Sequence, residues 1–183
     1  MKDTTTRFLL GAVLVGILIV GYAYLRAPEA TLVKVGEMAP ALELPSIGET
    51  VPTKLSSFRG RPVLLVMFLS GCRICESQAP ALERVYREYY RRGLVVLGVS
   101  VDAERTTTKA FIERHSITFF VLEDPNGRAV REAYGSWRMP EAYLIDASGK
   151  LDAIYLGATN LRAPELRERL ERLLPWPKPG EGR

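Results

Sequence analysis

Cysteine and histidine are scarce in this sequence, and their scarcity limits the metal sites that it can form. The 183 residues include two cysteines, Cys72 and Cys75, and a single histidine, His115. A closed structural zinc site takes four cysteine or histidine ligands. The chain offers at most three, and His115 lies far from the cysteines in the sequence. We therefore expect no metal site formed by this chain alone.

An arginine-rich stripe of the kind that binds nucleic acid is also missing. Lys and Arg total 25 against 21 Asp and Glu, which gives a net charge of +4. The arginines concentrate in residues 84–92 and 162–172, where glutamates are interleaved with them. This pattern is typical of solvated helix faces, and no aromatic–basic motif accompanies it. We expect no nucleic-acid partner.

Residues 8–25 (FLLGAVLVGILIVGYAYL) form a long run without any charge. As a helix, the run would span about 27 Å, close to the hydrocarbon thickness of a bilayer. Lys2 and Arg7 precede it, so the positive-inside rule predicts a single-pass protein of the cell membrane with a cytoplasmic N-terminus and a periplasmic domain. A cleaved signal peptide ending at residues 21–23 (GYA) is the alternative. Both interpretations export the folded domain.

The rest of the chain divides into three parts. Residues 26–35 are expected to form a tether, residues 36–174 one folded domain, and the proline-rich residues 175–183 a disordered tail. Apolar runs that alternate with amphipathic segments predict an α/β fold, in which helices flank a central mixed sheet and a hairpin precedes it. The expected strands are residues 36–44, 51–55, 63–69, 94–101, 118–122, 142–146 and 151–156, and the expected helices are residues 72–91, 106–115, 128–134 and 164–174.

The sequence Cys-Arg-Ile-Cys follows a buried strand directly and opens a helix. A helix N-terminus carries about half a positive charge and unpaired N–H groups, both of which stabilise a thiolate at Cys72. Arg73 adds a positive charge nearby. Cys75 lies one turn further and is placed to resolve a mixed disulfide formed at Cys72. We predict that Cys72 is the nucleophile and Cys75 the resolving cysteine.

In two alternative interpretations, the cysteines have no catalytic role. A structural disulfide would close a very short loop and would stabilise the fold by only about 2 kcal/mol. Two inert buried thiols would need a buried strand-to-helix junction, and such junctions are usually accessible to solvent. A third possibility, metal binding, meets the shortage of ligands described above.

Around the cysteines the sequence resembles the thioredoxin-like family of the redoxin superfamily, and most closely its membrane-anchored TlpA/ResA group of thiol-disulfide oxidoreductases. The similar segments are GEMAPALEL, LSSFRGRPVLLVMFLSGCRIC and RMPEAYLIDASGK, together with Pro80. The likeness covers residues 36–174. It implies a thioredoxin-like fold and a redox-active Cys72–Cys75 disulfide that works without a bound cofactor.

The resemblance also implies a substrate-binding segment and partners. Pro140 matches the family's cis-proline, which faces the two cysteines, and the backbone of Met139 would pair with the substrate chain. Thiols and disulfides of exported proteins would be the substrates, with cytochrome c precursors as the leading example. Electrons would arrive from a membrane thiol reductase of the DsbD or CcdA kind.

Several positions depart from the family's pattern. Gly71 replaces the usual aromatic residue before the first cysteine, and the dipeptide Arg73-Ile74 lacks a proline before the second. Val66 stands where thioredoxins carry a buried acid, and Gln78 stands where ResA-like members place a glutamate. We expect Gly71, Arg73 and Gln78 to tune the reduction potential.

No general base is evident near the cysteines. Glu76 and Glu141 are close in sequence to the two halves of the site, but we expect both to be exposed surface charges. The tripeptide FLS before the cysteines also resembles an accessory protein of methylamine dehydrogenase maturation, which leaves the substrate open.

Other functions remain as alternatives. A peroxiredoxin-type thiol peroxidase would show a P-x-x-x-T-x-x-C pattern, and residues 65–72 contain neither the proline nor the threonine. An SCO-like copper-carrying protein would have C-x-x-x-C and a distant histidine, whereas this chain has one residue fewer between its cysteines and offers only His115. A binding module without redox activity would have little reason to keep both cysteines.

Overall fold

The computed structural model describes residues 15–17, 33–49, 51–136, 138–157 and 163–174. The chain separates into two compact units, Met1–Ala30 and Thr31–Arg183. Residues 15–17 are helical, and the rest of the predicted anchor, most of the tether and the predicted tail lie outside the described residues. Within the described part, none of the helices has the length and apolar character needed to cross a bilayer.

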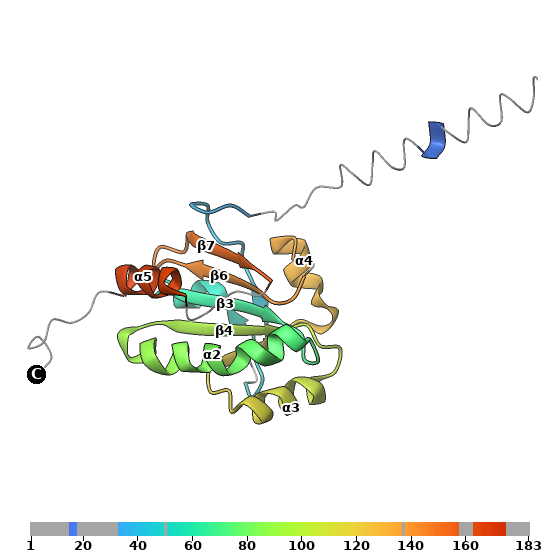
Figure 1. The fold of residues 1–183 in the computed structure, drawn as a ribbon, viewed down its shortest axis with the longest axis horizontal. Coiled ribbons are helices and arrows are strands. Elements are labelled where there is room, and N and C mark those ends of the chain that lie inside the picture. Colours follow the sequence, from blue (N-terminus) through green and yellow to red (C-terminus); the bar gives the residue numbers. More distant parts are fainter. Residues whose placement is uncertain (1–14, 18–32, 50, 137, 158–162, 175–183) are drawn as a thin grey trace, which may run out of the picture. The chain divides into compact units, whose positions relative to one another are not determined.

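The second unit is built around a five-stranded mixed sheet in the order β5-β4-β3-β6-β7 (Figure 1). β3 is parallel to β4, and β4 is parallel to β5, whereas β6 is antiparallel to both β3 and β7. The strands are β3 (Val63–Phe68), β4 (Val95–Ser100), β5 (Phe120–Glu123), β6 (Glu141–Ile145) and β7 (Leu151–Leu156). The predicted α/β architecture, with its parallel crossover between the first two buried strands, is confirmed.

Four α-helices connect or follow these strands. They are α2 (Arg73–Tyr89), α3 (Arg105–His115), α4 (Arg128–Tyr134) and α5 (Pro164–Leu173). Short 3₁₀ segments lie at Leu55–Phe58, Tyr90–Arg92 and Pro125–Gly127. Each predicted helix is present to within a few residues of its expected ends.

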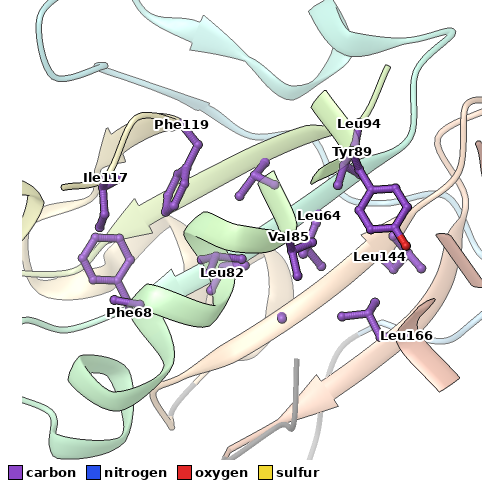
Figure 2. Packing of buried hydrophobic residues seen from close by; sticks show 14 of the residues in the cluster. Leu64, Phe68, Leu82, Val85, Tyr89, Leu94, Ile117, Phe119, Leu144 and Leu166 are labelled. Carbon is purple, nitrogen blue, oxygen red and sulfur yellow. The ribbon is translucent and has the colours of Figure 1, made fainter. Parts of the chain in front are cut away.

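β3 is buried on both faces, because its side chains alternate between two separate cores. Leu64 and Phe68 belong to the core that also receives α2, whereas Leu65 and Met67 belong to the core beneath α4 and the N-terminal segment. Leu82 of α2 packs into the first core, where it lies among the sheet residues (Figure 2). Burying one such leucine stabilises the fold by roughly 1.5–3 kcal/mol.

The N-terminal hairpin exists but is shorter than predicted. β1 (Glu43–Leu44) pairs antiparallel with β2 (Thr53–Lys54), and each strand has only two residues. The prediction of a continuous strand over residues 36–44 is wrong. Proline has no N–H to donate to a ladder. Pro40 and Pro45 lie on either side of β1, and Pro52 immediately precedes β2, so the paired strands stay short.

This topology brings two distant segments of the chain together. β3 and β6 are antiparallel neighbours with Met67 opposite Glu141. The end of β3 therefore lies beside the start of β6. As a result, the loop that leads into Cys72 faces the loop that contains Pro140.

Candidate active site

Cys72 occupies the N-cap of α2, and its side chain makes the capping contact. Its backbone is extended (φ −73°, ψ 113°), and its Sγ accepts a hydrogen bond from the Cys75 N–H at 3.4 Å. Gly71 supplies the turn before it with φ +81°, a conformation that L side chains rarely adopt. The sulfur therefore sits where a helix N-terminus best stabilises negative charge.

The two thiols differ in exposure and in acidity. Both are free; Cys72 is half-buried, and Cys75 is 3% exposed. Burial raises the pKa of the Cys72 thiol, but hydrogen bonds from the Cys75 thiol and from the N–H groups of Cys75 and Ile74 outweigh it and leave that pKa below the ordinary value. Burial, together with the hydrogen bond to Cys72, raises the pKa of Cys75 to about 12. In the reduced protein Cys72 is therefore the first of the two thiols to lose its proton, and Cys75 retains its own.

The proline loop meets the cysteines directly. The Met139–Pro140 peptide bond is cis, as the family resemblance predicts. The Cys72 thiol lies 3.7 Å from the Met139 carbonyl oxygen, to which it donates in its protonated form. A substrate chain that paired with the backbone of Met139 would therefore be held against the Cys72 sulfur.

A small cavity of about 20 Å³ lies behind Cys75. Val66, Gln78 and Pro140 contribute to its wall, and the remaining lining side chains are apolar. A space of this size holds roughly one water molecule. Among the described residues that line it there is no carboxyl group, so the structure shows no acid beside Cys75 at the two positions where the family pattern would place one.

The expectation that Glu76 is an exposed surface charge is wrong, because its side chain is partly buried. Its side chain is 25% exposed and bridges α2 to the end of α3, where it contacts Arg114 at 2.6 Å and also His115. The hydrogen bond with His115 and the one with Arg114 hold the pKa of Glu76 below its usual range. The charge of Glu76 in turn opposes thiolate formation at Cys72.

The expectation for Glu141 is also wrong, because its side chain is buried, with 5% exposure. The Glu141 carboxylate accepts a hydrogen bond from the Arg138 backbone N–H at 3.3 Å and another from the Tyr143 hydroxyl at 2.7 Å. Because side chains alternate along β6, Glu141 and Tyr143 share the face opposite α2. Glu141 thus fastens the loop that carries Met139 and does not face Cys75.

A second buried carboxylate, Asp102, was not among the predicted site residues, and it anchors the loop before Cys72. The Ser70 N–H and hydroxyl both donate to it, at 3.0 and 2.5 Å. The hydroxyls of Ser100 and Thr108 also donate, at 2.8 and 3.1 Å. These residues join the ends of β3 and β4 to α3. The available signal was the pair of polar residues, Ser100 and Asp102, at the end of the apolar run over 94–101.

His115, the last residue of α3, contacts Phe111 and Glu76 rather than the two cysteines. Its ring packs on Phe111 with centroids 4.6 Å apart, and its Nε2 contacts Glu76. Within the described part of the chain, no group of three or more Cys, His, Asp and Glu side chains is arranged to hold a metal ion. The remaining residue with an expected role, Arg73, is exposed at the first position of α2.

Comparison with known proteins adds independent information. The AhpC/TSA family matches residues 35–154. The thiol-disulfide oxidoreductase ResA of Oceanobacillus iheyensis is 32% identical over 131 residues, which cover 70% of this chain and 68% of the relative. ResA of Geobacillus thermodenitrificans is 31% identical over 147 residues, covering 80% and 82%.

A solved structure gives the same picture. A protein from Chlorobium tepidum, described as a thiol:disulfide interchange protein DsbE, matches with a TM-score of 0.71 and 29% identity over 78% of this chain and 99% of its own. The extent of the family match, the identity to the two ResA proteins and the shared thioredoxin-like fold agree with one another. The chain belongs to the AhpC/TSA family and, within it, is similar to thioredoxin-like thiol-disulfide oxidoreductases.

Proposed function

We propose that this thiol-disulfide oxidoreductase reduces disulfide bonds of exported proteins, with Cys72 as the nucleophile and Cys75 as the resolving cysteine. One observation carries the proposal. The Cys72 sulfur caps α2 and faces the Met139 carbonyl, while Cys75 is buried one turn behind it. An accessible, acidic thiol in front of a buried, weakly acidic one is the arrangement that two-step thiol–disulfide exchange requires.

In the first step, the Cys72 thiolate attacks one sulfur of the substrate disulfide. The substrate S–S bond breaks, a Cys72–substrate disulfide forms, and the other substrate sulfur leaves as a thiolate. The raised pKa of Cys75 keeps its proton in place at this stage. The Met139 backbone orients the substrate chain against Cys72.

In the second step, Cys75 loses its proton and attacks the Cys72 sulfur. The mixed disulfide breaks, the Cys72–Cys75 disulfide forms, and the second substrate sulfur leaves as a thiolate. One proton comes from Cys75, and solvent supplies the other when the two substrate thiolates are protonated. Two electrons pass from the protein dithiol to the substrate. No bound cofactor takes part.

The location and partners form part of the proposal. The uncharged run over residues 8–25 would anchor the chain in the cell membrane, with the catalytic domain on the periplasmic side. Reduction there needs electrons from the cytoplasm, so a membrane thiol reductase of the DsbD or CcdA kind would re-reduce the Cys72–Cys75 disulfide. Cytochrome c precursors are the substrate that the resemblance to the ResA proteins favours.

The reduction potential of the Cys72–Cys75 couple tests the proposal. The full chain in mild detergent is equilibrated against graded mixtures of reduced and oxidised dithiothreitol or glutathione, and the free thiols are counted by alkylation. A potential near that of thioredoxin, about −270 mV, is expected for a reductant. A potential near about −120 mV would make the protein an oxidant and contradict the direction of electron flow. The absence of any reversible couple would overturn the proposed roles of both cysteines.

A further inference from the structure

The carboxylate of Glu76 and the sulfur of Cys72 face different sides of the start of α2. The Glu76 N–H donates to the Cys72 carbonyl at 3.0 Å, so the two residues lie one helical turn apart. The Cys72 sulfur faces the carbonyl oxygen of Met139, which belongs to the loop before β6. The Glu76 carboxylate instead contacts the end of α3, the helix between β4 and β5. Because β4 and β6 flank β3 on its two sides, the two groups are directed toward opposite sides of β3 (Figure 1).

Two side chains of α3 hold the Glu76 carboxylate in this position. The Arg114 Nη1 donates to its Oε1 at 2.6 Å. The His115 Nε2 contacts its Oε2, and because an ionised carboxylate can only accept, this nitrogen carries the hydrogen. The His115 ring packs on Phe111, which in turn stacks on Phe68 of β3 with ring centroids 4.8 Å apart. Both carboxylate oxygens are therefore engaged by donors on a helix that is itself packed against the sheet.

A carboxylate that was free to move at this place would work against the thiolate. The N-terminus of a helix attracts negative charge, and the N-terminus of α2 already stabilises the Cys72 sulfur through the Cys75 N–H at 3.4 Å. Burial and the charge of Glu76 both raise the pKa of the Cys72 thiol, although the hydrogen bonds from Cys75 and Ile74 leave that pKa below the ordinary value. Pairing with Arg114 on the far side of the helix limits the opposition from Glu76.

We propose that Arg114 and His115 are positioning residues for the reaction, because they hold the Glu76 carboxylate on the α3 side of α2 and so keep Cys72 reactive as a nucleophile. The inference rests on the proposed function, since it concerns the acidity of the proposed nucleophile. Both residues act through Glu76, so their effect depends on the presence of its carboxylate.

The pH profile of Cys72 alkylation tests the proposal. The full chain in mild detergent is reduced, freed of reductant and treated with iodoacetamide over a range of pH, and the rate at Cys72 is followed by mass spectrometry. Arg114→Gln should raise the midpoint of the profile by about 0.5 pH unit. His115→Phe keeps an aromatic ring against Phe111 but removes the donor, and it should raise the midpoint by about 0.3 unit. His115→Gln, which retains a donor, should return the midpoint to within about 0.1 unit of the original.

The Glu76→Gln background separates positioning from a direct effect of charge. If Arg114 acts through the carboxylate, Arg114→Gln should shift the midpoint by less than about 0.2 unit in this background. A shift as large as the one measured with Glu76 present would show that Arg114 acts on the thiolate directly, and it would overturn the proposal. Arg128→Gln is the matched control, because it removes the same charge from an exposed ion pair with Glu132 on α4. The control should leave the midpoint unchanged.

A neutral disulfide, 4,4′-dithiodipyridine, separates the possible failures. If the reduced protein reacts rapidly with this reagent but neither Arg114→Gln nor His115→Phe moves the midpoint, the positioning roles are wrong and the redox function stands. If the reagent does not convert the Cys72–Cys75 dithiol to its disulfide, the proposed function itself fails. A midpoint that falls in the Arg114→Gln variant, or that moves equally in the Arg128→Gln control, would also overturn the inference.

Discussion

Asp102 should be the most important single side chain for holding the loop that leads into Cys72. It is 7% exposed and accepts four hydrogen bonds, two of them from Ser70. Replacing it by alanine removes the acceptor for all four. The hydroxyls of Ser100 and Thr108 lie 2.8 Å apart and can still bond to each other. The Ser70 N–H and hydroxyl, which are buried, would lose their partner.

The loss of stability in the Asp102→Ala variant can be worked out from the two buried donors of Ser70 that lose their acceptor. A buried donor left without an acceptor costs roughly 1–3 kcal/mol, so two of them cost roughly 2–6 kcal/mol. Water that enters the vacated space would recover part of this loss, and we expect a net decrease of about 3 kcal/mol in the free energy of unfolding. The Asp102→Asn variant keeps an amide oxygen that can accept from the Ser70 N–H, and it should lower the free energy of unfolding by about 1 kcal/mol.

Chemical denaturation of the reduced full chain in mild detergent measures these changes. Asp152→Ala is the control: Asp152 accepts from Arg169 at 3.1 Å and from Arg172 at 2.6 Å nearer the surface. Its loss should cost about 1 kcal/mol or less. A decrease for Asp102→Ala no larger than the one for Asp152→Ala would refute the reasoning.

The loop offers a second readout for the same residue. Because Ser70 precedes Gly71 and Cys72, loss of its anchor should change the rate at which iodoacetamide alkylates Cys72. Thr108→Val removes a hydrogen bond to Asp102 from the α3 side only. It should lower stability by about 1–2 kcal/mol and leave the alkylation rate unchanged. Equal changes of rate in the Asp102→Ala and Thr108→Val variants would show that the effect is general destabilisation.

Further predictions concern the cysteines themselves. The Cys75→Ser variant should accumulate mixed disulfides with substrate proteins on non-reducing gels, because Cys72 can still attack and no second thiol resolves the product. The Cys72→Ser variant should accumulate none. The opposite pattern would show that the roles of the two cysteines are exchanged. The pH profile of Cys72 alkylation should have its midpoint below the ordinary cysteine pKa. The Glu76→Gln substitution should move this midpoint lower still, because the charge of Glu76 opposes the thiolate. An upward shift of the midpoint would contradict this electrostatic account. Reduction of the disulfide consumes two protons below the Cys72 pKa and one above it, since Cys75 stays protonated up to about pH 12. The reduction potential should therefore fall by about 59 mV per pH unit below the Cys72 pKa and by about 30 mV above it, and a constant slope through pH 9 would show that Cys72 is not acidified.

From the sequence alone, the class of fold could be predicted and the two cysteines could be singled out as the candidate reacting groups. The short apolar runs at 63–69 and 94–101 are typical of strands buried on both faces, and the structure has β3 and β4 there. The helix between them, with two cysteines at its start, follows from local signals that do not depend on the rest of the chain. The family resemblance added the cis bond before Pro140, which no local pattern would have shown.

The contacts made by the polar groups around the cysteines depend on the tertiary structure. Glu76 and Glu141 look alike in the sequence, since each is a charged residue beside a functional segment. Glu76 bridges two helices, whereas Glu141 is buried on the opposite face of the sheet, where it holds the proline loop. Asp102 acquires its role because β3 and β4 end side by side, which places Ser70 within hydrogen-bonding distance. Such contacts join residues far apart in the sequence, and their geometry depends on strand order and register, so no local pattern specifies them.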